Sequence, residues 1–254
     1  MKFTHVFISR PRKEAEELAE MLVPLGLQPV AQPAFNFFSL DARSSQNEII
    51  NEMSLAGPDS LLIFTSPRSV AHGLSQLPDN ILYQARVAAI GPATAKALGD
   101  SGIRVNVTPP RGYTSEALLE FIADESSMST AVQPFAFIIA APGGRQKLLE
   151  GLKARNWRAR LVMVYKPAPA ELDRQALKTL VDASGVLSIW TSANAMKALS
   201  QRLPPAIWFQ LCQGDWLVIS ERLKRLARAY GPERIHLAQG PGNGDLISAI
   251  RGLV

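Results

Sequence analysis

Short apolar runs alternate with helical patterns along the whole chain. The apolar segment 3–8 is typical of a strand, and segment 12–25 carries apolar residues at spacings of three and four, which predicts an amphipathic helix. Gly26 is expected to end that helix, and a second strand is expected over 27–30. Further buried strands are predicted at 61–64, 87–90, 136–139, 161–164, 186–190 and 216–219. This alternation predicts an α/β fold, with parallel sheets covered by helices on both faces.

Three strand–helix units occur twice and in the same order. Ile63-Phe64-Thr65-Ser66 matches Ile189-Trp190-Thr191-Ser192, 126 residues later, and both copies open a helix. Pro11 and its helix match Pro142 at an offset of 131, and Ala89-Ile90-Gly91 matches Val218-Ile219-Ser220 at an offset of 129. The similar offsets predict a duplicated α/β half of roughly 125 residues. Two such lobes would enclose a cleft, which is a favoured place for a ligand.

The sequence offers two places for the chain to pass between the lobes. A tandem duplication would divide the chain near residues 125–133, where Ser126 to Thr130 is polar and loop-like. Two proline-bearing segments, Gln32 to Phe38 and Tyr165 to Pro169, could also carry the chain between lobes, but the residues alone favour the boundary near 125–133. Proline restricts the residue before it to extended conformations, which suits a linker.

Composition and charge narrow the class of protein. A chain of 254 residues with 47% hydrophobic and 19% charged residues is a folded globular protein. No apolar run reaches the roughly 20 residues of a membrane helix, and no signal-peptide core precedes the first strand. The single Cys212 excludes an intramolecular disulfide and fits a reducing, cytoplasmic location. A net charge of +5 favours an anionic partner, but the basic residues are spread along helices, so nucleic acid is not predicted.

The strand-to-helix junctions are polar and small, and they are the places where chemistry is expected. In parallel α/β sheets, ligands bind beyond the carboxyl ends of the strands. Helix N-termini there present unpaired N–H groups and partial positive charge. Several of them facing one cleft would bind a polyanion such as a polycarboxylate. The alternative is that the serines and threonines at these junctions only cap helices.

Tyr165 is the candidate proton donor. It is predicted to end the strand Leu161 to Val164, immediately before the second candidate linker, so its ring could point into a cleft. A phenol is a competent proton donor at neutral pH. The alternative interpretation is an aromatic anchor at a hinge.

Other chemistry-bearing residues are interpreted as structural. The turn 240–245 has neither a Walker sequence nor a dinucleotide fingerprint, and is interpreted as a capped turn before a helix. Cys212 lies in an apolar run and is interpreted as a packed thiol. His5, His72 and His236 have no carboxylate or cysteine at ligand spacing, so they are interpreted as structural or surface residues and no metal site is predicted.

Taken together, these residues resemble the uroporphyrinogen-III synthase family over nearly the whole chain. The resemblance is carried by the order and spacing of Ser9-Arg10-Pro11-Arg12, Phe64-Thr65-Ser66-Pro67-Arg68-Ser69-Val70, Ala89-Ile90-Gly91-Pro92-Ala93-Thr94-Ala95, Tyr113-Thr114-Ser115-Glu116-Ala117-Leu118-Leu119, Gly143-Gly144-Arg145, Val164-Tyr165-Lys166, Trp190-Thr191-Ser192 and Val218-Ile219-Ser220-Glu221-Arg222. It implies two similar lobes of parallel sheet flanked by helices and joined by a two-stranded hinge. One lobe would hold residues 1–36 and 167–254, and the other would hold residues 37–166.

The resemblance also implies a reaction. The family closes the linear tetrapyrrole hydroxymethylbilane without a cofactor: the terminal hydroxyl leaves as water, ring D attacks through its substituted carbon, and a spiro intermediate fragments and recloses with ring D inverted. The tyrosine matching Tyr165 would assist the departure of water. The residues implied to bind the polycarboxylate are Arg10, Arg12, Thr65, Ser66, Thr94, Ser115, Thr191, Ser192 and Ser220. A cytoplasmic monomer is implied, with no nucleic acid or membrane partner, that receives its substrate from the preceding pathway enzyme.

Two departures from the family pattern predict an unequal grip by the two lobes. Ala140-Ala141 stands where the family often has Arg-Gly, and Ser220 is followed by Glu221 and Arg222 instead of a Gly-Pro-Thr turn. Two other functions stay open on the residues. One is a non-catalytic two-lobed binder or regulator of a polyanion, and the other is a Rossmann-like nucleotide enzyme, against which the missing glycine-rich fingerprint argues.

Overall fold

A computed structural model of the protein describes residues 2–125 and 133–254. The chain forms two compact units: unit 1 is Met1–Asn36 with Ala168–Val254, and unit 2 is Phe37–Pro167. A tandem boundary near 125–133 therefore does not separate the units, because both flanks of that segment belong to unit 2. Residues 126–130, on which that boundary was predicted, lie outside the described residues.

Unit 1 contains a five-stranded parallel sheet with the strand order β11-β10-β9-β1-β2. Its strands are β1 (His5–Ile8), β2 (Gln28–Ala31), β9 (Val186–Trp190), β10 (Asp215–Val218) and β11 (Arg234–Leu237). Its helices are α1 (Arg12–Leu22), α9 (Arg174–Lys178), α10 (Ala193–Arg202), α11 (Pro205–Gln213), α12 (Glu221–Ala227) and α13 (Asn243–Arg251), with short 3₁₀ turns η1 (Val23–Leu25) and η4 (Arg228–Tyr230). The register places His5 opposite Gln28 on one side and opposite Val186 on the other.

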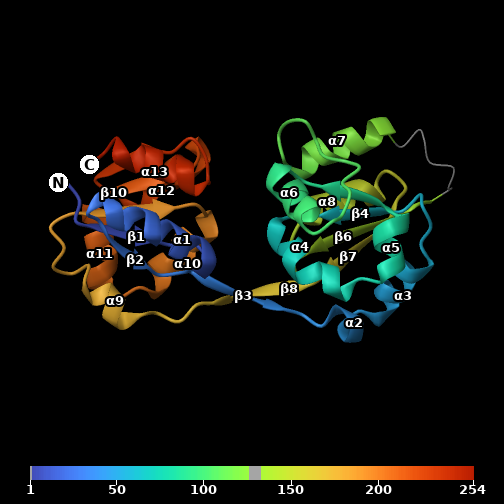
Figure 1. Cartoon of the computed structure of the whole chain (residues 1–254), viewed down its shortest axis with the longest axis horizontal. Coiled ribbons are helices and arrows are strands. Elements are labelled where there is room, and N and C mark those ends of the chain that lie inside the picture. Colours follow the sequence, from blue (N-terminus) through green and yellow to red (C-terminus); the bar gives the residue numbers. More distant parts are fainter. Residues whose placement is uncertain (1, 126–132) are drawn as a thin grey trace. The chain divides into compact units, whose positions relative to one another are not determined.

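Helices cover both faces of this sheet (Figure 1). The apolar stripe of α1 (Ala15, Leu18 and Leu22) is fully buried and shares one core with buried residues of α13. Helices α9 to α12 contribute to the core on the opposite face, around Trp190 and Trp216. Gly26 ends the first helical segment with φ of 72°, a left-handed conformation that glycine adopts without a Cβ clash.

Unit 2 contains a four-stranded parallel sheet with the order β5-β4-β6-β7. Its strands are β4 (Leu61–Phe64), β5 (Arg86–Ala89), β6 (Phe135–Ala140) and β7 (Arg158–Met163). Its helices are α2 (Ala42–Ser45), α3 (Asn47–Leu55), α4 (Pro67–Gly73), α5 (Asp79–Gln84), α6 (Pro92–Asp100), α7 (Ser115–Glu125) and α8 (Gln146–Lys153), with the 3₁₀ turn η2 (Leu74–Gln76). Helices α3 to α6 share a core with one face, and α7 and α8 share a core with the other. The predicted α/β class with helices on both faces is confirmed.

The repeated segments occupy equivalent places in the two sheets. The order β10-β9-β1-β2 in unit 1 corresponds to β5-β4-β6-β7 in unit 2. The first repeated strand, β1, thus pairs with the late strand β9, whereas its counterpart β6 pairs with the early strand β4. Each unit is therefore assembled from one piece of each repeat, which is why the repeat order along the chain does not give the division in space.

The two segments expected as linkers are strands. β3 (Phe35–Ser39) and β8 (Tyr165–Pro169) pair in a two-stranded sheet, side by side in Figure 1. Backbone bonds from Leu40 to Val164 (2.9 Å) and from Ala170 to Ala34 (3.1 Å) lie at the two ends of this ladder. Their positions make the pairing antiparallel. The chain passes between the units along these two strands.

Strand β11 was not predicted from the sequence. Its residues, Arg-Ile-His-Leu, are exposed or partly exposed, as expected of an edge strand. Such a strand lacks the buried apolar run that identifies the central strands, so only its pairing with β10 reveals it. No helix within residues 2–125 and 133–254 is long and apolar enough to span a membrane.

Candidate active site

The carboxyl ends of the four parallel strands of unit 2 lie along one edge of its sheet. Strand order places the turn after β5 first, followed by Thr65 and Ser66 after β4, Arg145 after β6, and Tyr165 after β7. This edge is where ligands bind in parallel α/β sheets. It brings together a phenol, a hydroxyl and a guanidinium from segments up to 100 residues apart in the sequence.

Ser66 and Thr65 have different roles at this edge. Ser66 is the N-cap of α4, and its Oγ accepts from the backbone N–H of Ser69 at 3.1 Å. The Thr65 Oγ1 donates to the carbonyl of Ile139 at 3.0 Å and is only 5% exposed as a residue. Thr65 thus joins β4 to β6, while Ser66 stays partly exposed.

Tyr165 is the first residue of β8, and not the continuation of β7, which ends at Met163. The prediction that it ends the strand 161–164 was therefore wrong, because the chain leaves the central sheet at Val164 to pair with β3. The phenol oxygen lies 3.4 Å from the Ser66 Oγ. The ring packs in the core of unit 2 beside Phe37 and His72, and the residue is 9% exposed.

Arg145 is a basic residue at this edge that was not among the site residues predicted from the sequence. It precedes α8 with φ of 61°, a left-handed conformation that is uncommon for a residue with a side chain. Its guanidinium donates to the Thr65 carbonyl at 3.4 Å. Burial lowers the pKa of Arg145, and the nearby Tyr165 and Glu116 partly oppose that shift. The turn Gly143-Gly144-Arg145 could have identified Arg145 as a site residue, because a cation in the loop after a parallel strand faces this edge.

The remaining candidates of unit 2, Thr94 and Ser115, are buried. Thr94 lies in the first turn of α6, and its N–H donates to the Gly91 carbonyl at 3.0 Å. Ser115 is the first residue of α7, but Thr114 provides the cap by accepting from the N–H of Ala117 at 3.2 Å. Both candidates therefore lie in the first turns of helices at the loop ends and are covered by their surroundings.

In unit 1 the equivalent edge carries two capping serines. Ser192 caps α10 by accepting from the Ala195 N–H at 3.4 Å, and Ser220 caps α12 by accepting from the Leu223 N–H at 3.3 Å. The capping interpretation thus holds for both, and each hydroxyl keeps its own proton to donate. Thr191 precedes Ser192 and is partly exposed.

The two arginine candidates of unit 1 are already paired within it. Arg10 donates to the Asn243 Oδ1 at the start of α13. Arg12 lies 4.0 Å from Glu16 in an exposed pair on α1. The turn before α13 is a capped turn, as expected, because the Asp245 carboxylate accepts from the Gly242 N–H at 3.2 Å. This carboxylate takes the position at the helix N-terminus where an anionic ligand would otherwise bind.

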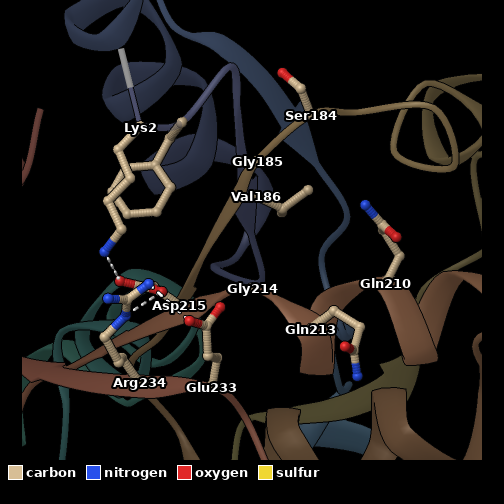
Figure 2. Close-up of a pocket in the computed structure, with 11 residues that line it drawn as sticks. Lys2, Ser184, Gly185, Val186, Gln210, Gln213, Gly214, Asp215, Glu233 and Arg234 are labelled. Atoms are coloured by element: carbon tan, nitrogen blue, oxygen red, sulfur yellow. Dashed lines mark hydrogen bonds and ion pairs between the residues drawn. The ribbon is translucent and has the colours of Figure 1, made fainter.

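A cavity of about 310 Å³ lies at the opposite, amino-terminal end of the strands of unit 1 (Figure 2). Asp215 lies within it, and its side chain is 2% exposed. Its carboxylate accepts from Lys2 at 2.5 Å, His236 at 2.6 Å and Arg234 at 3.3 Å. These groups satisfy one another and fasten the N-terminal segment to β10 and β11. Among the described residues, no group of three His, Cys, Asp or Glu side chains is arranged to hold a metal.

Asp215 is expected to make the stability of the protein depend on acidic pH. Burial raises the pKa of Asp215, but the hydrogen bonds from Lys2, His236 and Arg234 together outweigh it, so the pKa lies below its ordinary 3.8. Because this carboxyl has a lower pKa in the folded protein than in the unfolded chain, its ionised form stabilises the fold at pH values above the unfolded pKa. This stabilisation is lost as the pH falls through the pKa of the folded state. At pH 7, Asp215→Asn should lower the free energy of unfolding by about 1–3 kcal/mol.

Urea unfolding of both proteins from pH 7 down to pH 3 measures this effect. The difference in the free energy of unfolding between wild type and Asp215→Asn should become smaller as the pH falls below the ordinary pKa of the carboxyl. Asp100→Asn is the control, because Asp100 forms an exposed pair with Lys96 and should change stability by no more than about 0.5 kcal/mol. A difference that stays constant down to pH 3 would contradict the assignment.

Thr65→Val tests whether the Thr65 hydroxyl is structural. The substitution removes a buried hydrogen bond to Ile139 and conserves the shape of the side chain, so unfolding should become easier by about 1 kcal/mol. The value of kcat/KM should fall by less than about fivefold, because that hydroxyl proton is used within the sheet. Urea unfolding and steady-state kinetics give the two values; a loss above about 100-fold would mean direct contact with substrate.

The fold and this edge define a class of protein: a two-unit α/β protein whose polar groups gather at the carboxyl ends of parallel strands. A family model described as "Uroporphyrinogen-III synthase HemD" matches residues 16–248, and the chain belongs to that family. This confirms the resemblance seen in the sequence motifs.

Individual relatives agree with that membership. The chain is 26% identical to a uroporphyrinogen-III synthase of Escherichia coli K12, over 97% of this chain and 99% of the relative. It is 27% identical to the corresponding Salmonella typhimurium protein, with the same shares covered. A crystal structure of a mutant uroporphyrinogen III synthase from the extremely thermophilic bacterium Thermus thermophilus has a TM-score of 0.64 at 16% identity, covering 98% of both chains, and so shares the fold.

Proposed function

We propose that this protein is a uroporphyrinogen-III synthase of tetrapyrrole (heme) biosynthesis, which converts hydroxymethylbilane to uroporphyrinogen III with loss of water. Membership of the family over residues 16–248 supports the reaction. The observation that carries the assignment of the site is the Tyr165 phenol, 3.4 Å from the Ser66 hydroxyl at the carboxyl edge of unit 2. Both residues lie where a parallel α/β sheet presents its loops to ligands.

Departure of the terminal hydroxyl is the step in which Tyr165 acts. Its phenol donates a proton as the carbon–oxygen bond breaks, so the hydroxyl leaves as water and the electron-rich pyrrole stabilises the cation-like carbon. The substituted carbon of ring D then bonds to that carbon, and in the resulting spiro intermediate the bond from this ring D carbon to its original bridging carbon breaks. The released bridging carbon bonds to the free α-carbon of ring D, so ring D is inverted. A pyrrole proton lost at the end balances the one donated. Proton donation of this kind contributes at most about 10²–10⁴-fold.

Holding the substrate is the larger task. Ring D must be the nearest nucleophile to the electrophilic carbon, and such positioning accounts for much of the barrier reduction in reactions within one molecule. We assign carboxylate binding to the guanidinium of Arg145 and to helix N-termini capped by Ser66, Ser192 and Ser220. Each cap serine accepts from its helix and donates its own proton to a carboxylate.

The other candidates have supporting parts in this proposal. Thr191 is partly exposed beside Ser192 and binds substrate with it. Thr65, Thr94 and Ser115 are buried, and they hold the loops that carry the binding groups. Arg10 and Arg12 contribute positive charge near the loop after β1 while paired to Asn243 and Glu16.

The product distribution tests the function. Freshly made hydroxymethylbilane is incubated with the protein, and type I and type III uroporphyrinogen are resolved. The type III isomer is expected in excess over a protein-free control. Formation of type I alone, the spontaneous product, would mean a two-lobed binder or regulator without turnover. A rise in melting temperature with nucleotides would instead support the nucleotide-enzyme alternative.

The cellular setting completes the proposal. We place the enzyme in the cytoplasm, as a monomer that receives hydroxymethylbilane from the enzyme that produces it. The single, partly buried Cys212 fits a reducing compartment, since it has no partner for a disulfide within the chain. The reaction involves no net oxidation or reduction, so we propose that it proceeds without a cofactor.

A further inference from the structure

His72 lies one helical turn after Arg68 on α4, and both side chains cover aromatic residues of the paired strands. The imidazole stacks on the Tyr165 ring, with centroids 5.3 Å apart and planes at 26°. The Arg68 guanidinium lies 4.2 Å from the centroid of Phe37. Phe37 in turn meets Tyr165 edge-on, with centroids 6.0 Å apart. Two aromatic neighbours therefore hold the ring of Tyr165.

The orientation of His72 is itself fixed. Its Nδ1 lies 2.8 Å from the Oγ of Ser39, the last residue of β3. Its backbone carbonyl accepts from the Gln76 side chain, which also donates to the Val164 carbonyl at 3.1 Å. The imidazole is thus hydrogen-bonded to the end of β3, and the backbone of His72 is linked through Gln76 to Val164, the residue before Tyr165.

The surroundings of His72 favour an uncharged imidazole. Burial and the charge of Arg68 both lower the pKa of His72, so the neutral imidazole is favoured at neutral pH. A neutral ring stacks on the phenol without adding a cation beside a carbon that becomes cation-like in the proposed reaction.

The hydroxyl of Tyr165 needs such support. Its contact with Ser66 spans 3.4 Å, which is too long for a strong hydrogen bond to orient the phenol. A proton donor must nevertheless stay within hydrogen-bond reach of the group it protonates. We propose that His72 is a positioning residue: its stacked ring fixes the plane of Tyr165 and so aims the phenol at the leaving hydroxyl. This inference rests on the proposed function.

A double-mutant cycle with Tyr165→Phe tests the inference. His72→Ala should lower kcat about three- to tenfold and change KM less than about twofold, because the phenol stays present but is less well aimed. In the Tyr165→Phe background, His72→Ala should cause no further loss, since no hydroxyl is left to aim. His72→Phe should restore most of the lost kcat, because a phenyl ring can stack in the same place.

The controls separate this role from a structural one. Melting temperatures verify that each variant is folded, and His5→Ala, which removes an imidazole at the amino end of β1, should keep the wild-type kcat. Equal losses from His72→Ala in both backgrounds, an unchanged kcat, or a His72→Phe variant as impaired as His72→Ala would each overturn the inference. Wild-type protein that makes no type III product would overturn the proposed function, and this inference with it.

Discussion

Replacing Tyr165 with phenylalanine should lower kcat by about 10- to 100-fold while leaving KM and the melting temperature almost unchanged. Phenylalanine keeps the ring that stacks on His72 and meets Phe37, so the core of unit 2 is preserved. Only the hydroxyl is lost, and its 3.4 Å contact with Ser66 contributes little to folding. The expected loss falls below the upper range for proton donation, because the pyrrole itself helps to expel the hydroxyl.

Initial rates of type III formation at several pH values measure this effect. Tyr83→Phe is the matched control, because Tyr83 is 83% exposed and lies outside the candidate site. It should leave both kcat and KM at the wild-type values. Activity of Tyr165→Phe equal to wild type across the pH range would mean that Tyr165 is not the proton donor.

Replacing Arg145 with glycine should raise KM by about 10- to 100-fold without destabilising the protein. The guanidinium is the proposed partner of a substrate carboxylate, and a hydrogen bond to a charged group contributes about 1.5–3 kcal/mol. Glycine adopts the φ of 61° found at residue 145 without the Cβ clash that arginine has there. Relief of that clash should compensate for the lost 3.4 Å bond to Thr65, so the free energy of unfolding should stay level or rise by up to about 1 kcal/mol.

The control for this prediction is a second residue with positive φ. Asn156 has φ of 64° and lies before β7, at the amino-terminal end of the sheet. Asn156→Gly should change stability little, because asparagine tolerates the left-handed region, and it should leave KM unaltered. A wild-type KM for Arg145→Gly in steady-state assays would exclude Arg145 from substrate binding.

Most of the fold could be predicted from local patterns. The central strands are short, continuous apolar runs because both faces of each are buried, and β4 and β9 begin and end where the pattern predicts. The apolar spacing of three and four in α1 reports directly which face is covered. The edge strand β11 was not predicted, because its exposed and partly exposed side chains do not form a continuous apolar run.

The site could be predicted only in part. Ser66, Ser192 and Ser220 precede apolar helical patterns, and each caps a helix. The residues around Tyr165 could not be found in this way, since His72 lies 93 positions earlier and has no distinctive neighbours in the sequence. Its interpretation as a structural or surface histidine missed the stack on Tyr165, which exists only because β8 returns beside β3 and α4.

The sequence by itself determined the α/β class, the duplicated strand–helix units and the family to which the chain belongs. The class and the repeats follow from the apolar periodicity, which reflects burial at each position and not which distant segment lies alongside. The family follows from the order and spacing of the sequence motifs. The tertiary structure decided that each unit combines pieces of both repeats, and that a histidine, a tyrosine, a serine and an arginine meet at one edge of unit 2. Strand pairing between distant segments sets those contacts, and no local pattern encodes them.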